Sequence, residues 1–383
     1  MPEYINRILK KPKQSFFLFG PRGTGKTTWV SREFPTAYRI NLLDEALYQT
    51  YLADISQFSG EIRILENESW VFIDEIQRIP NLLNEVHRFI EEKQLKFILT
   101  GSSARKVRQA GVNLLAGRAW YKQMFPFLPE ELGESFELDS ILQFGSIPLI
   151  LNSPDKKESL KAYVQLYLKE EIKAEALVRN LPGFVRFLPV AGLFHGQVVN
   201  ISGIARDAGV SRTTIQGYLE ILEDTLMAFR LRAFESHVRV REKKHPKLYW
   251  GDPGIVRAVN NRFGELYPGE KGVLFEGLIA MMLRSYQSYK ELFDDFYYWA
   301  PAGAVKTEVD FVLKRRRELI AIEAKVSGRI HNEHLKGLKA IGDVPGLTRK
   351  ILVYPGNRKI LTEDKIEILP FNDFSRMLAS GRL

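Results

Sequence analysis

The stretch that most constrains this chain runs from Gly20 to Thr27 and reads Gly-Pro-Arg-Gly-Thr-Gly-Lys-Thr. It matches the pattern G-x-x-x-x-G-K-[ST] in full, and it follows an apolar run of strand length at 16–19. Glycines let the backbone turn its N–H groups toward a phosphate, and a helix that starts here adds the positive end of its dipole. Lys26 can reach the β- and γ-phosphates, and Thr27 can hold Mg²⁺. The loop therefore predicts a nucleotide triphosphate site with these candidate contacts: Gly20, Pro21, Arg22, Gly23, Thr24, Gly25, Lys26, Thr27 and Thr28.

Two acids, Asp74 and Glu75, end a second apolar run at 70–73. Continuous apolar runs are typical of parallel strands covered on both faces, and ligands bind at the carboxyl edge of such a sheet. Both acids would then lie beside the phosphate loop. We expect Asp74 to hold the Mg²⁺ shell and Glu75 to polarise the attacking water, which makes the predicted site hydrolytic.

A third apolar run, at 96–100, leads into Gly101, Ser102 and Ser103. The Ser102 hydroxyl is placed to sense a γ-phosphate; alternatively, this segment is the N-cap of a following helix. Strands and helices alternate through the first 150 residues, which predicts an α/β P-loop domain over 1–150.

The composition limits the remaining chemistry. The 383 residues include no cysteine, which excludes disulfides, cysteine-ligated metals and a thiol nucleophile. The N-terminus lacks an apolar signal core, and no apolar run of about 18 residues is present. We therefore expect a cytoplasmic protein without a membrane segment. The net charge of +9 by itself favours a nucleic-acid partner only modestly.

Four motifs carry a family resemblance: Gly-Pro-Arg-Gly-Thr-Gly-Lys-Thr at 20–27, Phe-Ile-Asp-Glu-Ile-Gln-Arg-Ile-Pro at 72–80, Leu-Thr-Gly-Ser-Ser-Ala-Arg at 99–105, and Leu-Leu-Ala-Gly-Arg at 114–118 followed by Phe-Pro-Phe at 125–127. Together they resemble bacterial and archaeal AAA-type ATP-binding proteins that carry a C-terminal domain of unknown function. The resemblance implies ATP as the nucleotide, with Mg²⁺, and a first sensor near Ser102. It also implies Arg118 as an arginine finger or sensor, acting in its own or a neighbouring subunit. The alternative for Arg118 is a pair with a surface acid.

The middle segment, 151–249, begins at a polar, turn-rich stretch and contains a helix-turn-helix pattern. A short helix is predicted to end at Gly209, and Ser211 is predicted to cap a second helix whose Ile215, Leu219 and Leu222 face inward. Its first turn would expose Arg212, Thr213, Thr214 and Gln216.

Seven basic residues follow this pattern: Arg230, Arg232, Arg239, Arg241, Lys243, Lys244 and Lys247. Alternation at 237–241 predicts a strand or hairpin wing with a cationic face. The combination predicts a winged helix that binds DNA through phosphate and base-edge contacts. The alternative is a winged helix used only for packing or protein contacts.

The last region, 250–383, combines an apolar helix carrying Glu276 with predicted strands at 308–313 and 319–326. Side chains alternate along a strand, so Glu323 and Lys325 share one face, and a hairpin would let Asp310 join them. These residues resemble the restriction-endonuclease-like PD-(D/E)xK pattern, with Val309 at the proline position. The resemblance implies catalytic roles for Glu276, Asp310, Glu323 and Lys325, with Asp310 and Glu323 holding Mg²⁺. The alternative is the same fold without cleavage.

The predicted fold class is therefore α/β: an AAA-type domain, a helical and winged-helix segment, and a mixed-sheet restriction-endonuclease-like domain. The first functional hypothesis is an ATP-hydrolysing, DNA-associated protein whose last domain cuts or grips DNA; assembly into a homo-oligomer is compatible with it. The rival hypothesis is a regulatory switch ATPase, in which the winged helix contacts proteins and the last domain is non-catalytic.

Overall fold

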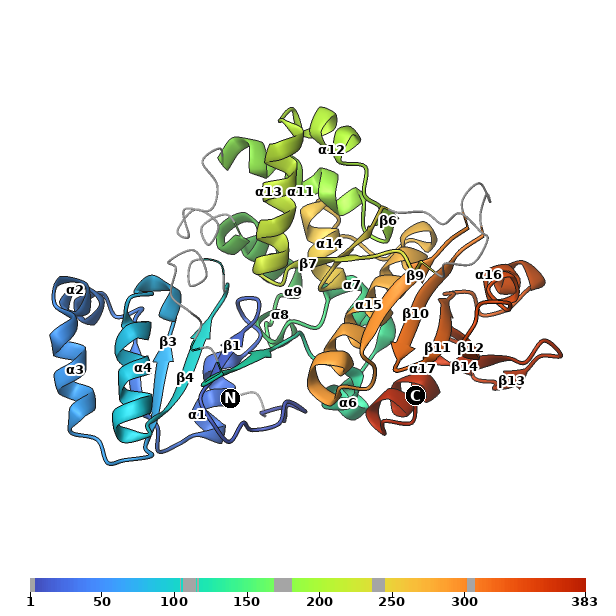
Figure 1. The fold of residues 1–383 in the computed structure, drawn as a ribbon. Helices are drawn as coiled ribbons and strands as arrows, with labels where there is room; N and C mark the ends of the chain where they lie inside the picture. The colour runs from blue at the N-terminus through green and yellow to red at the C-terminus, as the bar shows by residue number, and fades with distance from the viewer. Residues whose placement is uncertain are drawn as a thin grey trace.

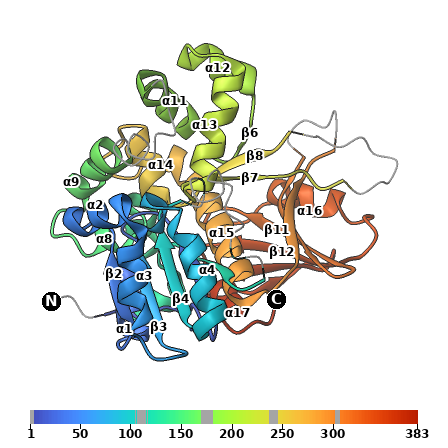
Figure 2. The ribbon, with the colours of Figure 1, turned by 60° about the vertical axis from the view of Figure 1, so that its left-hand side comes forward.

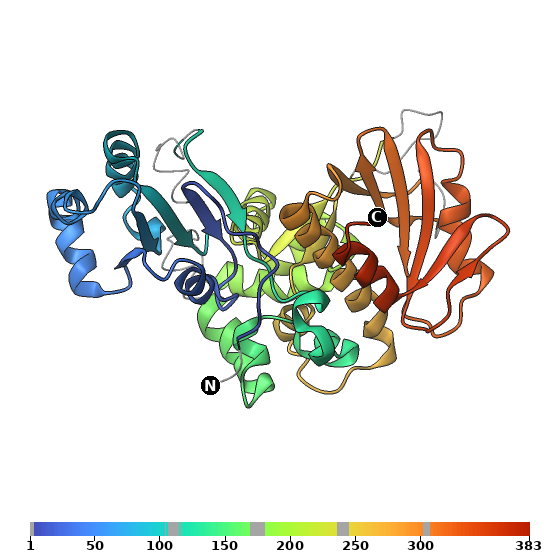
Figure 3. The same ribbon diagram turned by 90° about the horizontal axis from the view of Figure 1, so that it is seen from below.

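The computed structural model describes residues 4–103, 105, 115, 117–168, 181–235, 245–301 and 307–383. Within them the chain forms an N-terminal α/β unit, a largely helical middle unit with a small sheet, and a C-terminal unit built on a larger mixed sheet (Figures 1 and 2). Seen from below, the two larger sheets stand at opposite ends of the molecule with helices between them (Figure 3).

The N-terminal sheet has the strand order β2-β3-β4-β1-β5, and every neighbouring pair is parallel. Since parallel strands end at the same edge, the segments after β1, β3 and β4 meet there, as the sequence predicted. The elements of the unit are β1 (Phe16–Phe19), α1 (Lys26–Glu33), β2 (Tyr38–Asn41), α2 (Glu45–Ala53), α3 (Ile55–Arg63), β3 (Trp70–Asp74), the 3₁₀ turn η1 (Ile76–Arg78), α4 (Leu82–Lys93), β4 (Lys96–Gly101) and β5 (Trp120–Gln123).

Strand β1 explains why its apolar run is continuous. Phe16 and Leu18 belong to one apolar cluster, while Phe17 and Phe19 belong to another on the opposite face. Successive side chains of a strand point to opposite faces, so a strand covered on both sides needs an apolar residue at every position.

The middle unit joins helices to a three-stranded antiparallel sheet of order β6-β8-β7. Its elements are α6 (Pro129–Leu132), η2 (Gly133–Ser135), α7 (Leu138–Phe144), α8 (Pro148–Leu151), α9 (Lys156–Ala162), the π-helical η3 (Tyr163–Leu168), α11 (Leu181–Leu193), β6 (Gln197–Val198), α12 (Ile201–Ala208), α13 (Arg212–Asp224), β7 (Ala228–Leu231), β8 (Lys247–Trp250) and α14 (Pro253–Val259).

The predicted pair of helices is present as α12 and α13. Helix α12 ends at Gly209 in the left-handed region (φ 64°), where glycine avoids a steric penalty. The Ser211 hydroxyl caps α13 by accepting the Thr214 N–H at 3.1 Å. The predicted inward residues of α13 are fully buried: Ile215, Leu219 and Leu222.

Helix α14 begins at Pro253, within the turn signal at 252–254. The Asp252 carboxylate accepts the Ser146 N–H at 2.7 Å, and the Arg257 guanidinium donates to the Gln143 carbonyl at 3.0 Å. These bonds hold α14 against the segment around α7.

The C-terminal unit is a mixed sheet of order β13-β14-β12-β11-β10-β9, with α15 against it. Strands β9, β10 and β11 are antiparallel neighbours, whereas β11–β12 and β12–β14 are parallel pairs. The elements are α15 (Pro268–Lys290), β9 (Asp295–Trp299), β10 (Val309–Arg315), β11 (Glu318–Ala324), η4 (Asn332–Leu335), α16 (Lys336–Ala340), β12 (Leu347–Tyr354), β13 (Ile360–Leu361), β14 (Ile366–Pro370) and α17 (Phe371–Ala379).

The middle and C-terminal units are joined by backbone hydrogen bonds at the end of β7. Phe234 N–H donates to Tyr298 O at 2.7 Å, and Tyr298 N–H donates to Arg232 O at 3.0 Å. One apolar cluster runs from Leu9 to Leu383 through all three units. Among the described helices, even the 23-residue α15 is not both long and apolar enough to cross a membrane.

Candidate functional site

The phosphate loop has the backbone that its glycines predict. Gly23 and Gly25 adopt φ values of 78° and 87°, and a Cβ on Gly20 would lie 2.4 Å from the Met124 carbonyl oxygen. Gly25 precedes α1 without a side-chain cap, so the first N–H groups of α1 are not taken by a capping side chain. Lys26 Nζ donates to Gly20 O at 2.7 Å and to Pro21 O at 3.2 Å. The loop is thus shaped to present donors to an anion.

The two predicted metal-binding residues of this site lie together. Thr27 Oγ1 donates to Asp74 Oδ2 at 2.8 Å, and Thr100 Oγ1 donates to the other Asp74 oxygen. Hydroxyl and carboxylate oxygens are ligands that Mg²⁺ prefers, so this donor pair fits that ion. Thr100, which no sequence pattern indicated, lies near the end of β4 and orients the Asp74 carboxylate.

Glu75 occupies a left-handed backbone conformation (φ 62°) immediately after β3. A non-glycine residue there is strained, and such strain is concentrated at functional sites. Its carboxylate accepts a hydrogen bond from the Gln77 amide, whose nitrogen is also 3.4 Å from Ser102 Oγ. A Cβ on Gly101 would lie 2.2 Å from Gln77 Oε1, so glycine leaves room for this amide. Gln77, which no sequence pattern indicated, therefore connects the predicted catalytic Glu75 with the predicted sensor Ser102.

The middle unit contacts the back of the phosphate loop. Tyr163 OH donates to Arg22 O at 2.9 Å, and Leu149 N–H donates to Gly23 O at 3.1 Å. The conformation of the loop is therefore coupled to the position of α8 and η3.

A second contact joins the segment that follows β4 to helix α13. The Arg105 guanidinium lies 2.9 Å from Asp224 Oδ2 and 3.8 Å from Glu220 Oε2, both on α13. The segment after Ser102 is thus tied to the second helix of the helix-turn-helix.

Arg118 lies far from the phosphate loop of its own chain. It precedes β5, whose Trp120 pairs with Phe16 at the start of β1, whereas the loop follows the end of β1. Its guanidinium pairs with Glu91 on α4, which is the surface-acid alternative. In this arrangement Arg118 does not reach its own nucleotide site; a role on a second copy stays a prediction.

The strand or hairpin wing predicted at 237–241 lies outside the described residues, and the three described residues of the basic set are paired or buried. Arg230 forms a two-bond pair with Glu223, Arg232 pairs with Asp295 at 2.8 Å, and Lys247 is buried. The remaining four lie outside the described residues: Arg239, Arg241, Lys243 and Lys244. Three of the four predicted surface residues at the start of α13 are exposed: Arg212, Thr213 and Gln216. The fourth, Thr214, is half-buried.

The predicted acidic residues of the C-terminal sheet do converge. The β10–β11 register pairs Phe311 with Ile322, which sets Asp310 opposite Glu323. Asp310 Oδ2 accepts the Ala324 N–H at 2.9 Å, and Lys325 Nζ lies 2.5 Å from Glu323 Oε1 and 3.9 Å from Asp310 Oδ2. The hairpin therefore brings the two carboxylates and the lysine to one place, as predicted.

Glu276 of α15 joins this cluster together with a lysine that was assigned to the wing. Lys247 Nζ lies 3.4 Å from Glu276 Oε1, 3.3 Å from Glu308 Oε1 and 3.9 Å from Asp310 Oδ1. Burial and the Asp310 charge raise the pKa of Glu276 to about 7, and the same two causes raise the pKa of Glu323 well above its usual range. Burial lowers the pKa of Lys247, but the carboxylates outweigh it and raise the pKa above its ordinary value.

These residues do not fit the Mg²⁺ that the sequence resemblance implies. A metal shared by Asp310 and Glu323 needs the space beside their carboxylates, and there the Lys325 ammonium lies 3.9 Å from Asp310 Oδ2 and 2.5 Å from Glu323 Oε1, while the Lys247 ammonium lies 3.9 Å from Asp310 Oδ1. Among the described residues no group of three or more histidines and acids is arranged to hold a metal ion.

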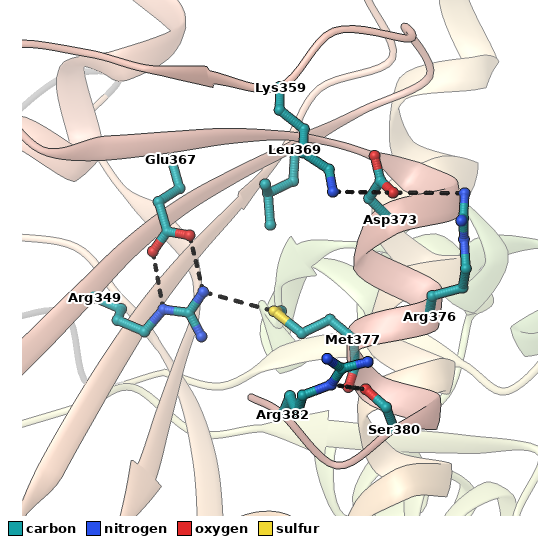
Figure 4. A pocket seen from close by; sticks show the side chains of 9 residues that line it. All are labelled: Arg349, Lys359, Glu367, Leu369, Asp373, Arg376, Met377, Ser380 and Arg382. Atoms are coloured by element: carbon teal, nitrogen blue, oxygen red, sulfur yellow. Dashed lines mark hydrogen bonds and ion pairs between the residues drawn. The ribbon is translucent and has the colours of Figure 1, made fainter.

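A separate charged pocket of about 440 Å³ lies between β12, β14 and α17 (Figure 4). Arg349 forms a two-bond pair with Glu367, while Lys359 and Arg376 share Asp373 at 3.3 and 3.5 Å. Its lining has four basic side chains against two acids, so the pocket is a moderately cationic surface, far from the nucleotide site in sequence.

Comparison with known families separates the chain into three matched regions. A family described as "AAA domain" matches residues 12–133. Two families described as domains of unknown function match residues 135–265 (DUF8612) and 271–374 (DUF4143). With the loop and sheet described above, the N-terminal unit is an AAA-type P-loop ATPase domain, which confirms that part of the sequence-based prediction.

Among curated relatives are the uncharacterized proteins Rv2008c of Mycobacterium tuberculosis and Mb2031c of Mycobacterium bovis. Each is 23% identical over 366 residues, covering 92% of this chain and 79% of the relative.

Two solved structures are similar in part. The replication initiator DnaA bound to AMPPCP and single-stranded DNA is 17% identical, with 56% of this chain and 83% of that chain covered and a TM-score of 0.28. The protein VC1899 of Vibrio cholerae is 15% identical, with 96% of each chain covered and a TM-score of 0.23.

Proposed function

We propose that this protein binds and hydrolyses ATP with Mg²⁺, and that the nucleotide state sets the arrangement of the units beyond the ATPase domain. The observation that carries the proposal is the meeting of the phosphate loop, the Thr27–Asp74 pair and Glu75 at one edge of a parallel sheet. Bound Mg²⁺ would neutralise charge that develops on the phosphates. Thr27 and Asp74 would hold it, and the backbone N–H groups of the loop would bind the phosphate oxygens.

Lys26 and Glu75 have separate roles in this proposal. Lys26 exchanges the carbonyl oxygens of Gly20 and Pro21 for phosphate oxygens. Glu75 accepts a proton from, and orients, the attacking water, while the Gln77 amide keeps its carboxylate directed toward Ser102.

DNA association is proposed through the winged helix formed by α12, α13 and the β7–β8 hairpin. The exposed Arg212, Thr213 and Gln216 support it, since exposed residues of these types at the start of a second helix suit phosphate and base-edge contacts. The ion pairs of Arg230 and Arg232 reduce the expected contribution of the wing.

A switch function is the second candidate, and the Arg105–Asp224 pair favours it. This pair and the Tyr163–Arg22 hydrogen bond link the nucleotide site to α13 and η3. Under this hypothesis the winged helix contacts a protein, and the restriction-endonuclease-like C-terminal domain, proposed from its Asp310–Glu323 hairpin, is non-catalytic.

The test is ATP turnover by the full chain, with and without duplex DNA, while the DNA is followed for cleavage in the same tube. Lys26→Ala should abolish nucleotide binding and turnover, whereas Glu75→Gln should retain binding and lose turnover. Glu92→Gln, at an exposed acid of α4, is the matched control. Full turnover by Glu75→Gln would refute the proposed hydrolytic role. Turnover without any DNA binding at low salt would remove the DNA partner and leave the switch.

A further inference from the structure

Lys247 is the point at which the middle unit enters the acidic cluster of the C-terminal unit. It is the first residue of β8, where it pairs with Leu231 of β7 and Val198 of β6. Its side chain is 2% exposed, and its ammonium also lies 5.4 Å from the centre of the Tyr298 ring. A lysine is rarely buried to this extent unless acids surround it.

The carboxylates around this ammonium come from two elements of the other unit. Glu276 belongs to α15, Asp310 to β10, and Glu308 directly precedes β10; all three have an oxygen within 4.0 Å of Lys247 Nζ. Tyr249, two residues further along the same face of β8, donates its hydroxyl to Glu276. Strand β8 thus supplies two neighbouring donors, Lys247 and Tyr249, to the carboxylate of Glu276, and this contact between the two units is therefore specific.

We propose that Lys247 is the resident cation of this cluster, and that the cluster is an ionic lock between β8 and the C-terminal sheet rather than a divalent-metal site. Mg²⁺ binds carboxylate oxygens at an Mg–O distance of about 2.0–2.1 Å. Placed on these carboxylates, its positive charge would repel the nearby Lys247 ammonium. The carboxylates of Glu276 and Asp310 can turn toward a metal only if their contacts with the Lys247 ammonium are lost. Lys325, whose side chain is 32% exposed, adds an ammonium 2.5 Å from Glu323 Oε1 and 3.9 Å from Asp310 Oδ2, so a divalent ion on these carboxylates would face two positive charges.

The lock has a consequence for the arrangement of the units. Lys247 directly follows the β7–β8 connection of the helix-turn-helix unit, so the three carboxylates fix the end of that connection to the C-terminal sheet. Removing the ammonium would leave like charges close together in a buried place, which a divalent cation would then relieve.

The test measures binding of Mn²⁺, the probe ion, by the full chain without nucleotide, using the electron paramagnetic resonance signal of free Mn²⁺. The variants are the wild type, Asp310→Asn, Lys247→Met and Lys247→Met with Asp310→Asn. Lys339→Met is the matched control, because Lys339 forms an exposed pair with Asp364 at 2.8 Å. Any Mn²⁺ held by Thr27 and Asp74 is the same in all of them.

We expect the wild type and Asp310→Asn to bind the same number of Mn²⁺ ions. Lys247→Met should bind one more Mn²⁺ ion than the wild type, and adding Asp310→Asn to Lys247→Met should remove this extra ion. The proposal is overturned if the wild type binds an ion that Asp310→Asn loses, or if folded Lys247→Met gains none. Should Lys247→Met fail to fold, the comparison of wild type with Asp310→Asn decides alone.

Discussion

The guanidinium of Arg105 lies 2.9 Å from the carboxylate of Asp224, which ties the segment after β4 to the last turn of α13. Both side chains are 19% exposed, so the pair is only partly screened by water. Ser102, the predicted sensor, precedes Arg105 by three residues, and a displacement of this segment would therefore act on α13 directly.

The first prediction is that Arg105 and Asp224 are energetically coupled. Arg105→Ala and Asp224→Asn should each destabilise the protein. The double variant should lose about 0.5–1.5 kcal/mol less stability than the sum of the two single losses, because the ion pair between the two residues can be lost only once. Urea denaturation of the four proteins measures this. The exposed Arg206–Asp207 pair is the control, and its cycle should give coupling near zero. Additive effects at Arg105 and Asp224 would contradict the proposed connection.

The second prediction concerns Gln77 as a positioning residue. Gln77→Leu keeps the volume of the side chain but removes the amide that donates to Glu75. We expect kcat for ATP to fall by about tenfold to a hundredfold, as for other outer-shell partners, while KM changes little. Gln77→Glu should not restore the rate, since a second carboxylate would repel Glu75. If ATP binding weakened by the same factor as kcat fell, Gln77 would have a structural role instead.

The third prediction tests the same geometry from the other side. A Cβ at Gly101 would lie 2.2 Å from Gln77 Oε1, so Gly101→Ala should displace the amide and reproduce the kcat loss of Gln77→Leu. Gly264→Ala is the control, because its Cβ would meet no atom within 4 Å. Combining Gly101→Ala with Gln77→Leu should add little further loss. If the kcat loss of the double variant equalled the product of the two single losses, the two residues would act separately.

The nucleotide site was predictable because its parts are encoded locally and brought together by a simple rule. The glycine pattern specifies the loop, the apolar runs specify parallel strands, and the shared sheet edge brings Thr27 to Asp74. Gln77 was not predictable in this way. Its amide lies 3.4 Å from Ser102 Oγ in the turn that follows the left-handed Glu75, and no local sequence pattern indicates either feature.

The C-terminal cluster shows the same limit more strongly. Alternation along strands correctly predicted that Asp310, Glu323 and Lys325 meet. Lys247, by contrast, was one of seven basic residues between positions 230 and 247, and its burial depends on the packing of β8 against α15 and β10. The turn signal at Asp252 was similarly ambiguous, since its carboxylate caps α14 and accepts the distant Ser146 N–H.

The fourth prediction separates exposed from neutralised arginines in the proposed DNA contact. Arg212→Ala should weaken duplex binding and reduce the slope of log K against log salt by about 1, because one phosphate contact is lost. Arg230→Ala should leave the slope unchanged, since Arg230 is already paired with Glu223. Fluorescence anisotropy over a salt series measures both. Equal slopes for wild type and Arg212→Ala would place the DNA contact elsewhere.

The fifth prediction follows from the buried carboxyl of Asp252. Burial raises its pKa from 3.8 to about 6, although backbone N–H groups such as that of Ser146 act in the opposite direction. The folded protein therefore retains this proton at pH values where the unfolded chain has released it, and stability falls as pH rises from about 4 through 6. Asp252→Asn cannot titrate. Its free energy of unfolding, minus that of the wild type, should rise over this range by up to about 3 kcal/mol, and urea denaturation at several pH values measures the difference.

Asp54 provides the control for this pH dependence, because it also caps a helix, α3, but is exposed. Hydrogen bonds from the Ser56 side chain and backbone lower its pKa, so its contribution to stability is present above the unfolded pKa and is lost as pH falls. The difference for Asp54→Asn should therefore move in the opposite direction to that for Asp252→Asn. If both differences moved together, the effect would come from helix capping in general and the burial of Asp252 would not be its cause.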